Sequence, residues 1–262
     1  MTHNFAMDRL RVATYNIHKG VRGMGPAQRL EIHNLGLAVE QFDADIVCLQ
    51  EVRRFDRRHS HRFERWPLEP QAEFLAPPGY HAVYRTNAIT RHGEHGNALL
   101  TRWPVLTHQH EDVSDHRLEQ RGLLHVVVLC HDHPVHVIVV HLGLLAGSRR
   151  RQVEQLKRFI GREVPRAEPL LVAGDFNDWG GGLAPAMGLA GLSCGPSLPV
   201  PTFPSRLPLV QLDYIYARGL QHHSSFTPHG PAWGRFSDHL PLIADFHWPH
   251  AATHVHDHDP TH

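Results

Sequence analysis

Short apolar runs, separated by polar and glycine-containing segments, recur along the chain. They occupy residues 10–15, 46–49, 98–100, 123–129, 135–140 and 170–173. Runs of this length that are rich in valine, isoleucine and leucine are typical of strands buried within a sheet. The pattern therefore predicts that each of these runs is a strand.

Two segments between these runs carry apolar side chains at helical spacing. The apolar positions are Leu35, Ala38, Val39 and Phe42 in the first segment, and Val153, Leu156, Phe159 and Ile160 in the second. A stripe of this kind covers one face of a helix that packs on a core. The order strand, helix, strand therefore occurs twice, which predicts an α/β fold.

The length of 262 residues and the 41% of hydrophobic residues suit a single domain with a substantial core. We expect this domain to span residues 1–249, with an irregular loop in the proline-rich stretch 192–209. Residues 250–262 contain little that could be buried and are predicted to be a disordered, histidine-rich tail. Metal storage by the histidines is an alternative, but a solvated tail without a catalytic role is favoured.

The charge balance argues against a protein dedicated to duplex DNA. Acidic and basic residues number 26 each, and the sequence pI is about 7.5, whereas such proteins usually carry a strongly basic surface. The three cysteines are widely spaced, which favours buried, reduced thiols over disulfides or a thiolate metal site. No signal-like segment and no apolar stretch long enough to span a bilayer is present, so we expect a cytoplasmic protein.

Polar side chains stand at the ends of four of the predicted strands. Asn16, Glu51, His141 and Asp175 close the first, second, fifth and sixth apolar runs. Buried polar groups are costly unless they are paired or bind a cation, and α/β proteins place sites at the carboxyl ends of their strands. Any one of these residues alone could be a strand end that meets solvent. Together they predict a shared site.

Eight short motifs then occur in the order used by the endonuclease/exonuclease/phosphatase superfamily, also called DNase I-like. They are TYNIHKG, LQEV, HGNALLTRWP, VHLG, GDFND, TFPS, QLDYIY and SDHLP, within residues 10–246. The chain resembles the compact bacterial members encoded beside cardiolipin synthases and the domain associated with GPI-lipid remodelling. The resemblance implies a four-layer α/β/β/α sandwich, in which two mixed β-sheets are flanked by helices.

The chemistry of phosphodiester cleavage and the resemblance both imply a hard divalent cation, Mg²⁺ or Mn²⁺. These ions prefer oxygen ligands and keep several waters, so one or two carboxylates suffice to hold them. Glu51 is expected to be the direct ligand, since it matches the glutamate of the family's QE motif. Asn16 is expected to assist through its amide oxygen. Asp238 is expected to complete the metal shell or to support His239.

The resemblance also assigns catalytic roles. Asp175 would orient or deprotonate the attacking water, and Asn177 would hold water or phosphate. His239 would donate to the phosphoryl oxygens, with Asp213 fixing the tautomer and orientation of its imidazole. His141 would hydrogen-bond the phosphate from the opposite wall. Spacing alone leaves open whether His239 acts as proton donor, base or electrostatic stabiliser.

Three further residues are candidates for substrate contact, each with a structural alternative. His18 lies two positions after Asn16 and could instead be a half-exposed strand-end residue. Asn97 could be a turn residue, and Arg121 a strand-edge arginine. The arginine-rich stretches 53–65 and 148–152 follow site motifs, so they either rim the active site or are solvated loops.

Hydrolysis of a phosphodiester in a phospholipid or small head group is the favoured function. The substrate partner is then a phosphate ester, peripheral contact with a membrane stays open, and no stable protein partner is implied. A nuclease acting on DNA or RNA is the enzymatic alternative, although the neutral pI disfavours it. A binding or scaffold protein on a retired phosphoesterase fold is the non-enzymatic alternative, which the complete set of acids and amides disfavours.

Overall fold

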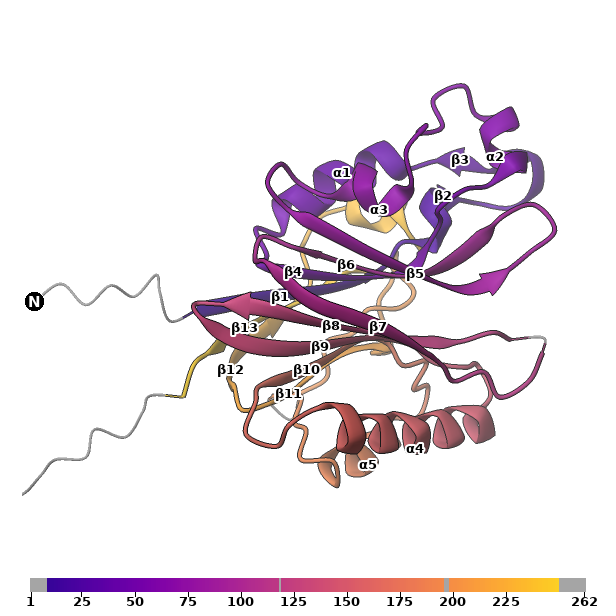
Figure 1. The fold of residues 1–262 in the computed structure, drawn as a ribbon. Coiled ribbons are helices and arrows are strands. Elements are labelled where there is room, and N and C mark those ends of the chain that lie inside the picture. Colours follow the sequence, from indigo (N-terminus) through magenta and orange to yellow (C-terminus); the bar gives the residue numbers. More distant parts are fainter. Residues whose placement is uncertain (1–8, 118, 196–197, 250–262) are drawn as a thin grey trace, which may run out of the picture.

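The computed structural model describes residues 9–117, 119–195 and 198–249. Two β-sheets pack face to face, and helices cover the outer face of each sheet (Figure 1). The expected four-layer α/β/β/α arrangement is therefore confirmed. The histidine-rich tail at 250–262 lies outside the described residues.

The first sheet has six strands in the order β12-β13-β1-β4-β6-β5. The strands are β1 (Arg9–Asn16), β4 (Ile46–Val52), β5 (His81–Ile89), β6 (Glu94–Thr101), β12 (Gln221–Phe226) and β13 (Leu242–His247). Strands β1 and β4 are parallel, and the other pairings are antiparallel. The sheet thus joins strands from both ends of the chain.

The second sheet has five strands in the order β11-β10-β9-β8-β7. The strands are β7 (Val105–Asp112), β8 (Gly122–Cys130), β9 (His133–His141), β10 (Leu170–Asp175) and β11 (Asp213–Arg218). Strands β9 and β10 are parallel, whereas their other neighbours run antiparallel. A short ribbon of β2 (Val21–Arg22) and β3 (Arg29–Leu30) stands apart from both sheets.

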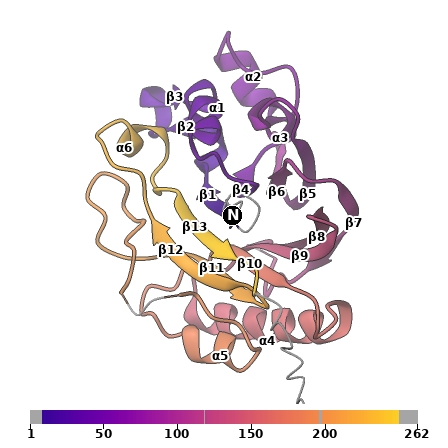
Figure 2. The same ribbon diagram turned by 90° about the vertical axis from the view of Figure 1, so that its left-hand side faces the viewer.

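Helices cover the two outer faces. The helices of the first sheet are α1 (Ile32–Gln41), α2 (Arg57–Arg62), α3 (Gln71–Leu75) and α6 (Trp233–Phe236), and those of the second are α4 (Ala146–Glu163) and α5 (Ala184–Gly188). Figure 2 shows the two groups on opposite sides of the paired sheets. Both helices predicted from apolar spacing are present, as α1 and α4. No helix in the described ranges is long and apolar enough to cross a membrane.

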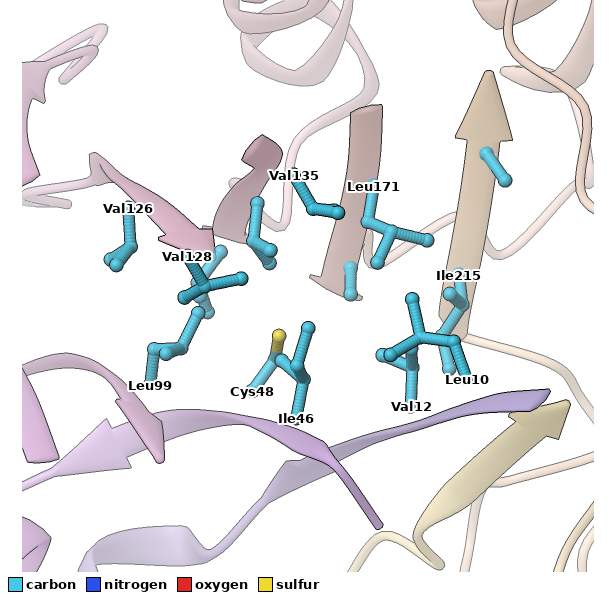
Figure 3. Packing of buried hydrophobic residues seen from close by; sticks show 14 of the residues in the cluster. Leu10, Val12, Ile46, Cys48, Leu99, Val126, Val128, Val135, Leu171 and Ile215 are labelled. Carbon is cyan, nitrogen blue, oxygen red and sulfur yellow. The ribbon is translucent and has the colours of Figure 1, made fainter. Parts of the chain in front are cut away.

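The main core lies between the two sheets. Side chains such as Val12, Cys48 and Leu99 of the first sheet meet Val126 and Leu171 of the second (Figure 3). Because successive strand residues point to opposite faces, the remaining apolar positions pack under the helices in two further clusters. Every apolar run identified in the sequence is a strand of this core.

One buried amide connects the two sheets. Asn97 of β6 is fully buried, and its Nδ2 donates to the carbonyl oxygens of Gly122 at 3.0 Å and Val139 at 3.1 Å. These acceptors belong to β8 and β9 of the opposite sheet. Since Asn97 lies within a strand, the alternative that it is a turn residue is wrong. It therefore joins the two sheets by polar contacts.

Replacing Asn97 by alanine should lower the free energy of unfolding by about 1–3 kcal/mol, because two buried carbonyl groups lose a donor. Urea denaturation followed by circular dichroism measures this. The control is Asn34→Ala on the exposed face of α1, where a change within about 0.5 kcal/mol is expected. Equal stability of the two variants would contradict a role for Asn97 in holding the sheets together.

Candidate active site

The carboxylate of Asp175 lies at the centre of a buried polar cluster. Its Oδ2 accepts a hydrogen bond from Asn16 Nδ2 at 3.0 Å. The Nε2 atoms of His141 and His239 lie 3.5 Å and 3.6 Å from the same oxygen. All four side chains are almost completely buried. The structure therefore brings these predicted site residues together.

Strand pairing explains how three of the site residues become neighbours. Asp175 at the end of β10 pairs with His141 at the end of the parallel strand β9. On its other side, Asp175 pairs with Asp213 at the start of the antiparallel strand β11. One row across the second sheet thus presents an imidazole and two carboxylates at the same edge.

The first sheet supplies Asn16 and Glu51 from its adjacent parallel strands. Asn16 pairs with Gln50, so Glu51 follows directly beside it. The pairing of β4 with β6 is irregular between Leu49 and Val52, and Glu51 has a φ of 58°. This left-handed conformation is uncommon for a residue with a side chain. It places Glu51 Oε1 3.5 Å from Asn16 Nδ2, at the meeting point of the sheets.

His239 is paired with a buried acid. Its Nδ1 lies 2.8 Å from Asp213 Oδ2, so Nε2 faces Asp175. Burial alone lowers the pKa of His239, but the charges of Asp213 and Asp175 outweigh burial and raise it to about 10. The imidazole is therefore positively charged at neutral pH.

His141 is held in the opposite charge state. Burial lowers its pKa to about 4, and the charge of Arg121 acts in the same direction. Burial also raises the pKa of the Asp175 carboxyl that lies between the two imidazoles. At neutral pH the site thus contains one neutral and one charged imidazole on either side of one carboxylate.

Glu51 faces a cation from the short 3-10 turn His18–Gly20 that follows β1. The ammonium of Lys19 lies 3.0 Å from Glu51 Oε2. Burial opposes ionisation of Glu51, but the charge of Lys19 keeps its pKa below the usual range. Although Lys19 is close, Glu51 Oε2 accepts no hydrogen bond of normal geometry within the described part of the chain. Sequence analysis did not single out Lys19, although it lies within the TYNIHKG motif.

Asp238 and His18 form a pair at the more open side of the site. His18 Nδ1 lies 3.3 Å from Asp238 Oδ1, and the Asp238 side chain is 42% exposed. The hydrogen bond with Asp238 raises the pKa of His18. His18 also lies close to Asn16, because the His18 backbone N–H donates to Asn16 Oδ1 at 3.1 Å. A direct metal contact from that amide oxygen remains a prediction.

Asn177 connects the two loops that follow β9 and β10. Its backbone N–H donates to Asp175 Oδ1 at 2.9 Å, and its side-chain Nδ2 donates to the carbonyl oxygen of Leu142 at 3.0 Å. It adopts a positive φ of 49°. These contacts position Asp175 and the loop after His141. Contact of Asn177 with water or phosphate remains a prediction.

Two further features border the site and were missed in the sequence. Ser237 donates from Oγ to the carbonyl oxygen of Asn16 at 2.6 Å, which joins the SDHLP segment to the end of β1. The ring of Phe203 lies 5.0 Å from the imidazole of His239, and Trp179 packs against Phe203 while remaining 48% exposed. Ser237 and Phe203 belong to recognised motifs, but their contacts arise only from the fold.

Arg121 lies near the site through Glu119. Its guanidinium lies 3.1 Å from Glu119 Oε1 and donates to the carbonyl oxygen of Leu142. Its charge contributes to the low pKa of His141. Arg121 is therefore paired with an acid beside the site, and contact with substrate remains a prediction, as it does for Asn97 and His18.

The two arginine-rich stretches differ in which of their arginine side chains are buried or paired. In the first, Arg57 and Arg58 are exposed on α2, and Arg62 donates to the carbonyl oxygen of Pro26. In the second, Arg149 is buried and Arg151 pairs with Asp115. Arg57 and Arg58 of the first stretch and Arg150 of the second are exposed and could border a site mouth.

Asp175, Asp213 and His239 also form the one group, among the residues that the structure describes, whose metal-ligating atoms lie within 4.8 Å of one another. The Asp213–His239 hydrogen bond already uses one atom of each residue. For this reason we regard the trio as a positioned imidazole beside a carboxylate. Glu51 Oε2 accepts no hydrogen bond of normal geometry within the described residues and faces the Lys19 ammonium at 3.0 Å; its role as a cation ligand remains a prediction.

The chain is similar to a family model and to a bacterial relative over most of its length. Residues 13–239 match the family model described as "Endonuclease/Exonuclease/phosphatase family". The "Uncharacterized protein YbhP" of Escherichia coli K12 is 38% identical over 245 residues, which cover 90% of this chain and 96% of YbhP.

Solved structures share the fold at lower identity. An endonuclease/exonuclease/phosphatase from Beutenbergia cavernae has a TM-score of 0.68 at 21% identity, covering 92% of this chain and 72% of that chain. A functionally unknown conserved protein from Enterococcus faecalis has a TM-score of 0.72 at 21% identity, covering 92% of this chain and all of that chain.

The two imidazoles should show opposite protonation across neutral pH. The pKa of His239 is raised to about 10, so its contribution to stability is full below about pH 6.5 and is lost as the pH rises toward 10. The pKa of His141 is lowered to about 4, so stability falls as the pH drops from about 6.5 toward 4. Side-chain ¹⁵N NMR at pH 7 should find His239 doubly protonated and His141 neutral.

Asp213→Asn removes the charge that holds His239 protonated, so the His239 titration should move to lower pH in the same NMR experiment. Asp245→Asn is the matched control, because Asp245 pairs with Arg11 and does not contact either imidazole. Titration of both wild-type imidazoles near pH 6.5 would refute this description of the site.

Proposed function

Because the chain belongs to the Endonuclease/Exonuclease/phosphatase family, whose members are hydrolases that act on phosphoesters, we propose that it hydrolyses a phosphodiester with the help of a divalent metal ion. The observation that carries the proposal is the convergence of Asn16, His141 and His239 on one oxygen of Asp175. Glu51 lies beside this cluster on the same edge. The cluster contains residues from both sheets. Apolar packing of the sheets does not by itself require these polar groups to meet.

The residues around Glu51 fit a hard cation. The Glu51 carboxylate is nearly buried, has an oxygen without a hydrogen bond, and already faces the Lys19 ammonium. Its low pKa keeps it ionised at neutral pH. Mg²⁺ or Mn²⁺ suits such an oxygen donor. When bound, the ion would neutralise charge on the phosphate. Asp238, across from His18, is the carboxylate that we propose to complete the shell.

In this proposal Asp175 accepts a proton from water, and His239 donates to the phosphate. Burial raises the pKa of Asp175, which favours acceptance of a proton from the attacking water. His239 carries a positive charge and directs Nε2 away from Asp213. It would therefore donate to a phosphoryl oxygen as negative charge develops there.

His141 and Asn16 have orienting roles in this proposal. His141 is neutral and fully enclosed, so it would offer a single Nε2–H to the phosphate from the wall opposite His239. Asn16 directs its Nδ2 toward the carboxylates of both Asp175 and Glu51. It would thus hold the proton acceptor and the cation ligand at a constant separation.

For the substrate, we propose a small or lipid-linked phosphodiester. Support comes from the neutral charge balance and from the resemblance of the sequence to lipid-associated bacterial proteins. The nuclease alternative uses the same catalytic residues, so only substrate assays separate the two. A retired fold that binds without cleaving is less compatible with a complete buried cluster.

The purified protein should hydrolyse a member of a panel that contains bis-p-nitrophenyl phosphate, glycerophosphodiesters, phospholipids, plasmid, abasic duplex and oligonucleotide. Activity should require Mg²⁺ or Mn²⁺ and disappear with EDTA. Glu51→Gln and Asp175→Asn should each lower turnover by about 10³ or more, because each removes a group on which the chemical step depends.

The matched control is Glu154→Gln, which changes an exposed carboxylate of α4 that pairs only with Lys157. It should retain wild-type turnover. Full activity in EDTA, or in the Glu51→Gln variant, would rule out the proposed mechanism. Cleavage of the nucleic acids alone would favour the nuclease alternative.

A further inference from the structure

A cavity of about 740 Å³ lies beside the proposed active site and is lined by four arginines. Arg22 and Arg29 come from the β2–β3 ribbon, Arg206 from the loop after Phe203, and Arg235 from α6. Figure 2 shows this ribbon and α6 on the same side of the first sheet. We call these residues the arginine cavity.

The charges of the arginine cavity are not balanced by acids. None of its four guanidinium groups lies within 4.0 Å of a carboxylate in the described ranges, although many other arginines of the chain do. Glu31 is the one acid among the lining residues, and it accepts a hydrogen bond from Asn34. The cavity therefore has a positive potential.

The fold holds these like charges close together. Arg22 and Arg29 stand directly opposite each other in the ribbon, and like charges in such a cross-strand pair are destabilising. Burial lowers the pKa of Arg22, and the charge of Arg206 lowers it further. An arrangement that costs stability in the free protein becomes favourable once an anion binds there.

The cavity is directly connected to the proposed catalytic cluster. Arg22 donates to the carbonyl oxygen of Ser237 and to Ser205 Oγ. Ser237 in turn donates to the carbonyl oxygen of Asn16, and it immediately precedes Asp238 and His239. The arginine cavity, which Arg235 and Phe236 line, therefore borders the chain segment that carries Asp238 and His239.

We propose that the arginine cavity binds a second phosphate group of the substrate, separate from the phosphodiester that is cleaved. This inference rests on the proposed function and makes it more specific. Guanidinium groups bind phosphate in bidentate geometry, and the volume lies in the range of small-ligand sites, about 300–1,000 Å³. The preferred substrates are then phosphodiesters that carry an additional phosphomonoester.

A small substrate fits these observations better than a nucleic acid strand. The four arginines line one cavity, whereas an extended strand needs a basic track along the surface. The overall charge of zero also provides no general attraction for a polyanion.

The first test measures binding and does not need catalysis. Inorganic pyrophosphate is titrated into the full-length protein in EDTA by isothermal calorimetry. The variant Arg29→Gln/Arg206→Gln/Arg235→Gln should bind the probe at least about tenfold more weakly, since three charged donors are lost. Arg22 is left unchanged because it also holds Ser237.

Two controls isolate the cavity. Arg65→Gln/Arg91→Gln/Arg158→Gln changes the net charge equally at exposed positions outside the cavity and should bind like wild type. Glu51→Gln should also bind pyrophosphate normally. Equal binding by the cavity variant and wild type, or equal weakening in the control triple variant, would overturn the proposal.

The second test uses the 5′-(p-nitrophenyl phosphate) of thymidine with and without a 3′-phosphate. The 3′-phosphate should lower KM for wild type by about fivefold or more, with little change in kcat, as expected for a contact made equally in ground and transition states. The cavity variant should lose this advantage and keep its kcat. A 3′-phosphate effect that persists in the cavity variant would contradict the proposal.

The two tests separate this inference from the proposed function. If neither the thymidine esters nor any member of the substrate panel is hydrolysed but the cavity variant loses pyrophosphate binding, the arginine cavity is an anion site and the proposed reaction is wrong. If hydrolysis depends on Glu51 but pyrophosphate binding does not depend on the arginines, the reaction stands and the second-phosphate site is wrong.

Discussion

The buried carboxylate of Asp175 is the constraint on which the rest of the site depends. A desolvated carboxylate is costly unless it has close polar partners, and Asp175 obtains them from both sheets. Asn16 reaches it from the first sheet, His141 from the neighbouring strand, and His239 from the segment before β13. Asp175 therefore obtains its full set of polar partners only when the two sheets pack together.

Different electrostatic environments give the imidazoles of His141 and His239 different pKa values. His141 is enclosed without a carboxylate in direct hydrogen-bond contact and stays neutral, while Asp213 supports His239 from behind and keeps it charged. The sheet produces this asymmetry, because Asp213 and His141 flank Asp175 on opposite sides. A charged and a neutral imidazole thus face one another across the Asp175 carboxylate.

The sequence was sufficient for strands with continuous apolar content and for the polar residues that end them. It did not predict β5, β7, β11, β12 or β13, because polar or charged residues shorten or interrupt their apolar runs. Within the site, the ends of strands predicted Asn16 and Asp175, whereas the motifs predicted His239. The Lys19–Glu51 contact was missed because it depends on positive φ at both residues, which no periodicity reveals.

The pairing of the first strand with the last has a consequence for synthesis on the ribosome. Arg9 of β1 lies opposite His247 of β13, so one edge of β1 has no partner until nearly the whole chain has been translated. His239 precedes this last strand by only a few residues. The His239 imidazole is thus delivered together with the strand that completes the sheet, and a nascent chain cannot form the polar cluster before its sheet is finished.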